Sequence, residues 1–254
     1  MHPTLISARY TLHDAWHHRI VSFASALCAS LFFMGSFFTT LIVSGHTKVL
    51  IDFCCGAYHL FSIMFVLIFV VNYLHRLEQT HFYHWFLTSG CTRYAFLIGS
   101  FCAFSIIIFA SAFLFFFSIL LFLYYQTNIW FFYLWPAFCM YALEGILLIS
   151  FALFWSMLLS LYWCYAALLG SYLMCVLNHS WIAIMQQKTG GIARIACFAF
   201  YYLMPDLELI NIQSNVMYEL PINYAHVFFA ICYSACFCAV ILFATIKIFE
   251  KKNL

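Results

Sequence analysis

Glu144 is the only charged residue in a long apolar run, residues 129–154, and it lies about halfway along that run. Placing a charged side chain at the centre of a lipid bilayer costs about 2.5 to 3.5 kcal/mol on insertion scales. If the run crosses a membrane, this carboxyl group must face other helices or a water-filled cavity. Two interpretations stay open: a functional group in a substrate path, gate or proton site, or a hydrogen bond that packs helices together.

Sulfur and imidazole groups gather in another apolar run, residues 49–73. Cys54, Cys55, His59 and Met64 combine thiol, imidazole and thioether groups, which suit copper(I). Only Cys55 and His59 share a helical face, and no second pair of ligands is specified. Side-chain packing is therefore the simpler interpretation, and we predict no metal site.

Two histidines lie within apolar runs and raise a different possibility. His59 and His226 could ligate a haem if they faced each other. A four-helix haem bundle normally presents two such pairs, whereas this chain offers one. A membrane haem or quinone protein, or an assembly subunit of a respiratory or maturation complex, is the alternative function that these residues leave open.

The chain as a whole is far too apolar for a water-soluble fold. It has 254 residues, of which 67% are hydrophobic and 7% charged, whereas a soluble domain carries roughly 25% charged residues. The net charge of +2 gives no basis for a nucleic-acid surface. About 20 helical residues cross the roughly 30 Å of bilayer hydrocarbon. We predict an all-α polytopic membrane protein with six transmembrane helices, in the apolar runs 21–44, 49–73, 94–125, 129–154, 158–177 and 224–249.

Basic residues outside these runs indicate the orientation in the membrane, because cytoplasmic loops are enriched in Lys and Arg. With both termini in the cytoplasm, the inner basic residues are Arg9, Arg19, Arg76, Arg93, Lys247, Lys251 and Lys252. The outer basic residues are then only Lys48, Lys188 and Arg194. An even number of spans agrees with this topology, since both charged ends then lie on one side.

Residues 1–20 precede the first apolar run and are predicted to form an amphipathic helix at the membrane surface. Leu5, Ala8 and Leu12 fall on one side of such a helix, and Ser7 and Thr11 fall on the other. This pattern is typical of a helix that lies in the plane of the interface. A simple anchor that sets the entry angle of the first span is the plainest role for it.

Two further segments hold most of the remaining polar residues. Residues 74–93 are too polar for the membrane core and too rich in aromatic residues for a flexible linker, so we expect them to pack against a partner or against headgroups. Residues 178–223 have an apolar centre that is interrupted by glycines and prolines. Irregular backbone at membrane depth must be covered by protein or line a cavity, so we expect short re-entrant helices in the outer leaflet.

Three segments together carry a more specific pattern. The first is LISARYTLHDAWHHRI at residues 5–20, and the third is YYLMPDLELINI at residues 201–212. The second combines a glutamate, an apolar pair, a serine, an arginine and a tyrosine–glycine step at Glu78, Phe86, Leu87, Ser89, Arg93, Tyr94 and Gly99. In order and spacing these segments resemble the membrane subunits (permeases) of type-2 ABC transporters, particularly the branch associated with maturation of multicopper enzymes.

The resemblance implies a role for each part of the chain. Residues 1–20 would be the cytoplasmic elbow helix, residues 21–254 a six-span permease domain, and residues 74–93 the loop with the coupling helix that meets an ATPase. Candidate residues for ATPase coupling are Glu78, His81, Trp85, Phe86 and Arg93. Candidate residues of the interfacial elbow are Arg9, Trp16 and Arg19. Glu144 is the candidate residue of a substrate path or gate.

The resemblance also implies partners. Two copies of the chain would join two copies of a separate ATPase subunit in a bacterial inner membrane. The sequence has no phosphate-binding loop and no dinucleotide fingerprint, so ATP and Mg would be bound by the partner. We predict no catalytic residue, no metal ligand and no cofactor in this chain, which would be a transport subunit and not an enzyme.

Overall fold

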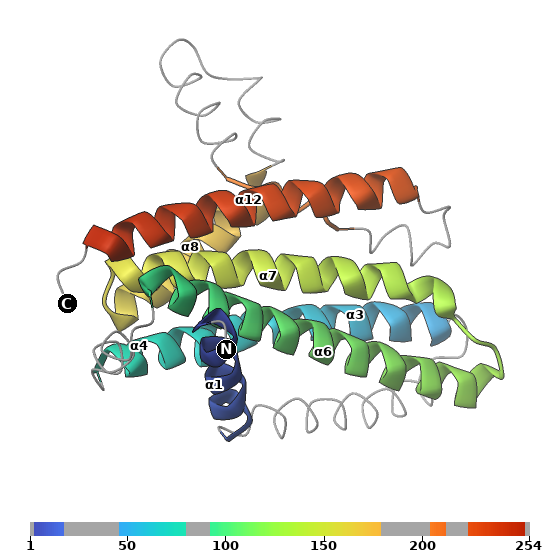
Figure 1. The fold of residues 1–254 in the computed structure, drawn as a ribbon. Helices are drawn as coiled ribbons and strands as arrows, with labels where there is room; N and C mark the ends of the chain where they lie inside the picture. Colours follow the sequence, from blue (N-terminus) through green and yellow to red (C-terminus); the bar gives the residue numbers. More distant parts are fainter. Residues whose placement is uncertain (1–2, 18–45, 80–91, 179–203, 212–222, 252–254) are drawn as a thin grey trace, which may run out of the picture.

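The computed structural model describes residues 3–17, 46–79, 92–178, 204–211 and 223–251. Within these residues the chain is helical and contains no strand (Figure 1). The elements are α1 (Pro3–His17), α3 (His46–Met64), the π-helical turn η1 (Phe65–Val70), α4 (Val71–Gln79), α6 (Arg93–Thr127), the 3-10 turn η2 (Phe132–Leu134), α7 (Trp135–Leu158), α8 (Leu161–Val176) and α12 (Tyr224–Lys251).

Four helical stretches are long and apolar enough to cross a membrane. They are Ile51–Leu77, Tyr94–Tyr125, Phe132–Leu158 and Tyr224–Lys251. They coincide with four of the six predicted spans and are compatible with a helical membrane protein. The predicted first span, residues 21–44, lies outside the described residues. The predicted fifth span corresponds to α8, which has 16 residues and is shorter than the roughly 20 that a crossing takes.

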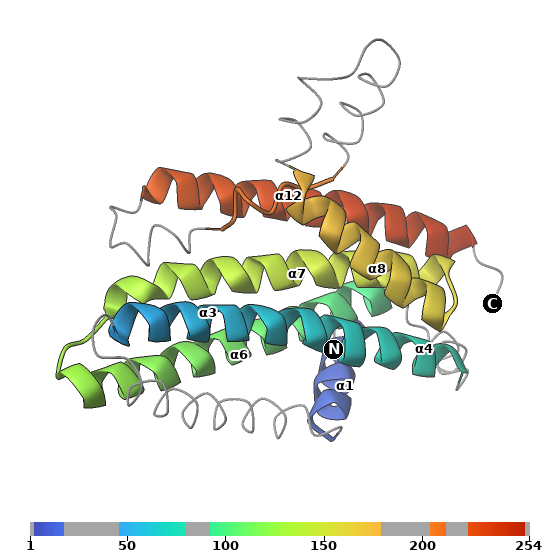
Figure 2. The same ribbon diagram turned by 180° about the vertical axis from the view of Figure 1, so that it is seen from behind.

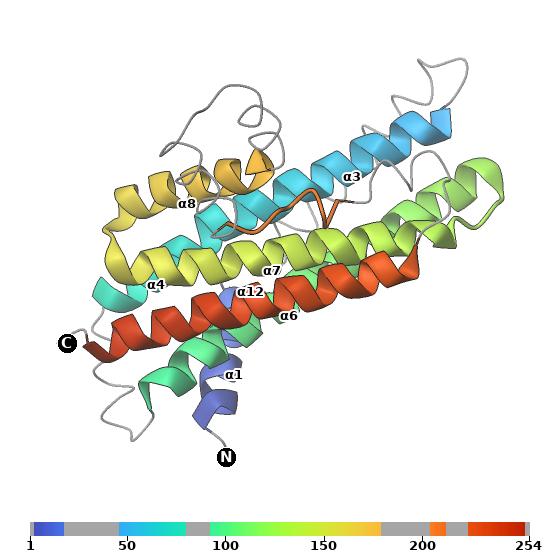
Figure 3. The ribbon, with the colours of Figure 1, turned by 90° about the horizontal axis from the view of Figure 1, so that it is seen from above.

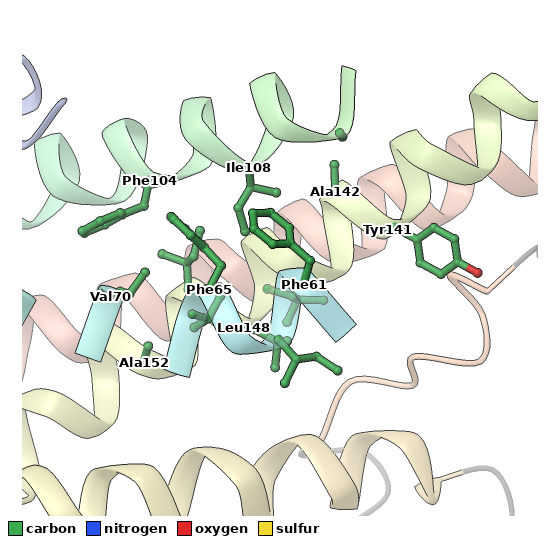
Figure 4. Close-up of a cluster of buried hydrophobic side chains, with 14 of the residues drawn as sticks. Phe61, Phe65, Val70, Phe104, Ile108, Tyr141, Ala142, Leu148 and Ala152 are labelled. Atoms are coloured by element: carbon green, nitrogen blue, oxygen red, sulfur yellow. The ribbon is translucent and has the colours of Figure 1, made fainter. Parts of the chain in front are cut away.

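Helix α7 is the centre of the bundle and contacts α3, α6, α8 and α12 (Figures 1 and 2). It forms a hairpin with α8, because only Leu159 and Ser160 separate the two helices. Seen from above, α12 runs alongside α7 over most of its length (Figure 3). The apolar core between α3, α6 and α7 includes Phe61, Phe65, Val70, Phe104, Ile108, Tyr141, Ala142, Leu148 and Ala152 (Figure 4).

Helices α3 and α4 are two parts of one longer helix, which η1 interrupts. A π-helical turn holds an extra residue relative to an α-helix, and such turns occur frequently at functional sites. Phe65, Val66, Leu67 and Val70 of the turn are buried. The Asn72 side chain donates a hydrogen bond to the backbone oxygen of Ile68, at 2.6 Å. The turn therefore sets the rotation of α3 relative to α4 from within the core.

Helix α1 crosses α6 at a steep angle and packs against it (Figures 1 and 3). The Ser7 hydroxyl donates to the backbone oxygen of Phe96 at 3.1 Å, and the Tyr73 hydroxyl donates to Thr11 Oγ1, also at 3.1 Å. Ser7 and Thr11 are fully buried, whereas Leu5 on the opposite side is 65% exposed. The polar side of this helix, which was expected to face water, is thus the side that packs on the protein.

Aromatic side chains mark both ends of the bundle. At one end, between α6 and α7, the rings of Tyr124 and Trp130 stack at 4.4 Å and those of Trp130 and Phe132 at 5.6 Å. At the other end, Tyr162 and Trp163 are exposed at the start of α8. Tyr and Trp are enriched in membrane proteins where the chain meets the membrane–water interface. Both ends of the bundle show this enrichment.

The basic residues of α3, α4, α6 and α12 divide between the same two ends. The end of α4, the start of α6 and the end of α12 lie together at one end of the bundle, and the start of α3 lies at the other (Figures 1 and 3). The first end carries Arg76, Arg93, Lys247 and Lys251, and the second carries Lys48. This distribution follows the charge bias from which the orientation was predicted.

Candidate functional site

A polar cluster lies inside the apolar bundle, where three helices meet. His59 of α3 places its Nε2 atom 2.8 Å from Oε1 of Glu144 on α7. The hydroxyl group of Tyr172 on α8 lies 3.3 Å from the same nitrogen. The ring of Tyr141, on α7, stacks on the imidazole with 5.4 Å between centroids. One imidazole thus connects three helices.

The helical repeat explains why these side chains meet. Tyr141 and Glu144 are three residues apart on α7, so they project from the same face of that helix. Glu144 lies 14 residues before the end of α7, and Tyr172 lies 11 residues after the start of α8. At 1.5 Å per residue these positions are about 21 Å and about 17 Å from the α7–α8 connection. The hairpin therefore brings Glu144 and Tyr172 to nearly the same depth.

The two members of the ion pair are buried to different extents. The side chain of Glu144 is 9% exposed and that of His59 is 28% exposed. Burying a carboxylate without a partner is strongly unfavourable, and removal of one partner of a buried pair commonly costs about 3 to 5 kcal/mol. The imidazole therefore compensates the carboxyl group, while part of its own surface stays accessible.

Other ionisable side chains surround the pair at longer range. Cys55, one turn before His59 on α3, is buried, and Tyr141 interacts electrostatically with both Cys55 and Asp52. On α8, Cys175 interacts electrostatically with Glu144 and with Asp206. Groups from α3, α7, α8 and the segment 204–211 thus share one region of a bundle that is otherwise apolar.

The segment 204–211 connects this region to α12. The Asp206 backbone N–H donates to the Tyr233 hydroxyl at 2.9 Å, and the Asp206 carboxylate accepts from the Glu208 N–H at 3.0 Å. The Asn178 side chain donates to the backbone oxygen of Met204 at 3.1 Å. These bonds tie the end of α8 and the face of α12 to one turn. The remaining residues of the predicted re-entrant segment, 179–203 and 212–222, lie outside the described residues.

The residues predicted to couple to an ATPase fall at the boundary of the described structure. Glu78 lies in the last turn of α4 and Arg93 begins α6, but neither side chain belongs to the described residues. His81, Trp85 and Phe86 lie outside them altogether. The expectation for these five residues stays a prediction.

The predicted elbow residues are described only in part. Arg9 is exposed on α1. Trp16 belongs to the last turn of α1, and its side chain is not described, while Arg19 lies outside the described residues. The helix ends at His17, within the predicted limits of residues 1–20.

The sulfur and histidine groups considered as metal or haem ligands have other surroundings. Cys54 and Cys55 are buried in the core. His59 Nε2 lies within hydrogen-bonding distance of Glu144, and His226 Nε2 lies 2.9 Å from the backbone oxygen of Leu209. Within the described ranges no three His, Cys, Asp or Glu side chains are grouped so that they could hold a metal ion.

The partnership of His59 with Glu144 was missed at the sequence level, although a signal for it existed. Each residue lies near the middle of its own apolar run, at residues 49–73 and 129–154. Two spans of similar length place their midpoints at the same depth, and a buried carboxyl group needs a partner. Depth matching alone would have paired them. It would not have identified Tyr172, whose depth depends on the α7–α8 connection.

Comparisons with known proteins assign no family to the chain. No protein-family model matches it, and no curated protein matches it. The function must therefore be argued from the residues and their arrangement.

Proposed function

We propose that the chain is the membrane-spanning subunit of an ABC transporter in a bacterial inner membrane. It would move a substrate across or out of the membrane with energy from ATP hydrolysed by a separate ATPase subunit. The observation that supports this best is the placement of α1. Through Ser7 it bonds to α6, and through Thr11 it bonds to Tyr73 on α4. These are the two helices that border residues 80–91, where the ATPase contact is expected.

This arrangement suits the transmission of a mechanical signal. A partner that pulls on residues 80–91 acts directly on the end of α4 and on the start of α6. Helix α1 braces both helices, and α4 continues through η1 into α3, which carries His59. A movement of the loop would therefore reach the His59–Glu144 pair along one helix. ATP binding and hydrolysis would shift the population between two arrangements of the bundle.

The outer faces of the bundle fit a second copy of the chain as well as lipid. Helix α12 exposes large apolar side chains along its length, among them Phe228, Phe229, Val240 and Phe243. In the proposed transporter two copies join two ATPase subunits, and the substrate path runs between the two copies. Glu144 is the candidate residue that contacts the substrate or gates its path.

The test is reconstitution with an ATPase. The chain is co-expressed with the ATPase encoded beside it, and the complex is purified in detergent and assayed for ATP hydrolysis. We expect a stable complex whose ATP hydrolysis drops several-fold when Trp85→Ala is introduced. Glu250→Gln is the control, because Glu250 is an exposed residue in the last turn of α12. Absence of a complex, together with unchanged hydrolysis by the ATPase, would refute the proposal.

A further inference from the structure

One imidazole nitrogen is within hydrogen-bonding reach of two different helices. His59 Nε2 lies 2.8 Å from Glu144 Oε1 and 3.3 Å from the hydroxyl oxygen of Tyr172. This nitrogen carries either one hydrogen or one lone pair. A carboxylate can only accept a hydrogen bond, whereas a phenol can also donate one. The two neighbours therefore suit opposite states of the same atom.

The protonated ring pairs with Glu144. Its Nε2–H donates to the carboxylate, and opposite charges meet at hydrogen-bonding distance. A proton lost from Nδ1 would leave the Nε2–H bond to Glu144 in place, whereas a proton lost from Nε2 leaves a lone pair on that nitrogen, which a carboxylate oxygen repels. The Tyr172 O–H can then donate to it. Glu144 is left as a buried carboxylate without its counter-charge, which weakens the attachment of α3 to α7.

From this geometry we infer that His59, Glu144 and Tyr172 form a proton-binding site, in which α3 is held by α7 when the proton is bound and by α8 when it is released. His59 is the more exposed partner, at 28% against 9% for the Glu144 side chain. The inference concerns the chain alone and goes beyond its proposed role beside an ATPase.

Every element around the pair contributes ionisable groups to this region of the bundle. On its own helix, α3, His59 is accompanied by Asp52 and Cys55, and Tyr141 on α7 interacts with both of them and with Glu144. On α8, Tyr172 and Cys175 interact with Glu144. Asp206, from the segment 204–211, interacts with Cys175. Glu144 is the acidic group of this set that acts on His59 itself, and it favours a positive charge on the imidazole.

Thermal unfolding as a function of pH tests the inference. The full chain is purified in detergent without any ATPase, and its unfolding midpoint is followed between about pH 5 and 9, the range in which histidine changes charge. The wild-type midpoint is expected to fall by a few degrees as the pH rises, because the folded state loses the proton that joins α3 to α7. Glu144→Gln should flatten this dependence, by lowering the midpoint at acid pH and raising it at alkaline pH.

The tyrosine variant should act at the opposite end of the range. Tyr172→Phe removes the donor that holds the unprotonated ring, so the midpoint should drop mainly at alkaline pH. Tyr162→Phe is the matched control, since Tyr162 lies on the same helix and is exposed, and its profile should follow the wild type throughout.

Two results would overturn the inference. Equal displacement of the midpoint at every pH by Glu144→Gln and Tyr172→Phe would reduce the cluster to ordinary packing. A His59→Gln variant that keeps the wild-type pH profile would place the titrating group elsewhere, and this measurement remains decisive if the Glu144 variant does not fold. Because no ATPase takes part, these outcomes are independent of whether the transporter proposal holds.

Discussion

At the scale of single residues, Gly99 on α6 allows a close approach of two helices. Among the described glycines, it is the one whose added Cβ atom would come nearest to another helix, α1. A Cβ atom at Gly99 would collide with the Ser7 side chain and would lie 2.8 Å from the backbone oxygen of Thr4. Only glycine allows α1 to approach α6 closely enough for Ser7 to reach the Phe96 carbonyl. A residue without a side chain thus fixes the position of the N-terminal helix.

Gly99→Ala is expected to detach α1. Overpacking of this kind typically costs about 1 to 3 kcal/mol, and here the clash is with backbone as well as side chain. The measurement is the rate of tryptic cleavage after Arg9, which is exposed on α1 and becomes a better substrate when the helix loses its support. A several-fold faster cleavage is expected. Gly170→Ala is the control, because a Cβ there meets nothing within 4 Å, and a cleavage rate equal in both variants would contradict the prediction.

Tyr58 is completely buried and makes a second kind of residue-scale contact. Its hydroxyl donates to the backbone oxygen of Ile108 on α6 at 3.2 Å, and its ring packs against Phe115 and Phe138. Tyr58→Phe should lower the free energy of unfolding by about 1 kcal/mol, the usual worth of one hydrogen bond. Tyr58→Ala should cost about 3 to 5 kcal/mol, because it also leaves a cavity.

Denaturant unfolding in detergent would measure both Tyr58 variants. Tyr125→Phe serves as the control, since Tyr125 is 82% exposed and loses no contact to the core. Equal losses for Tyr58→Phe and Tyr58→Ala would mean that the hydroxyl group, not the ring, carries the contribution of this side chain.

The sequence predicted the surroundings of some residues and not of others. Glu144 could be assigned to the bundle interior because the cost of a charge in lipid depends only on its position along the run. The sides of α1 could not be assigned in the same way. Helical periodicity separates Ser7 and Thr11 from Leu5, but it does not say whether the polar side meets water or another helix. In a lipid environment an apolar side chain is as well placed outside as inside.

At the scale of elements, the interruption between α3 and α4 determines which side chains meet at the centre. The turn Phe65–Val70 holds one residue more than an α-helix would over the same path. In an uninterrupted α-helix of the same residues, those before the turn, His59 included, would be rotated by about 100° relative to those after it. No residue type in this segment signals a π-helical turn, because its side chains are the same apolar types as those of the neighbouring turns.

Deletion of Ile68 should convert this segment to a regular α-helix. Because the turn takes up one extra residue over the same path, its removal should leave α3 and α4 in the same relative rotation, with His59 still facing Glu144. We expect the variant to keep the wild-type dependence of its unfolding midpoint on pH. Ile68→Ala is the control, since Ile68 is 47% exposed and its side chain contributes little to the core. Loss of the pH dependence in the deletion variant alone would contradict the role given to the turn.

The long helices were predictable because their length follows from the thickness of the bilayer. The runs 49–73, 94–125, 129–154 and 224–249 each correspond to a helix, but α6 and α12 extend to Thr127 and Lys251. Polar residues can continue a helix beyond the hydrocarbon, where water satisfies their side chains. Helix α8 is the exception, since it has 16 residues and is shorter than the predicted span, residues 158–177.

At the scale of the whole molecule, the arrangement of helices follows from packing and not from the order of spans. Helix α7 contacts α3, α6, α8 and α12, although two of these, α3 and α12, are not joined to it by a short connection. The sequence does not say which apolar run lies at the centre of the bundle and which at its edge, because runs of similar composition can contact lipid as well as protein. The sequence and the fold do place the charge at the ends of the bundle in the same way.

The two ends of the bundle are expected to lie on opposite sides of the membrane, with the basic end inside. Arg76, Lys247 and Lys251 lie at this end (Figure 1), while Asn128, at the exposed end of α6, lies at the other. In sealed vesicles with the native orientation, a membrane-impermeant thiol reagent should therefore modify Asn128→Cys from outside and Glu250→Cys only after permeabilisation. The parent chain provides the blank for its own twelve cysteines. The reverse pattern would invert the topology, and modification of both positions from one side would contradict a bundle that spans the membrane from end to end.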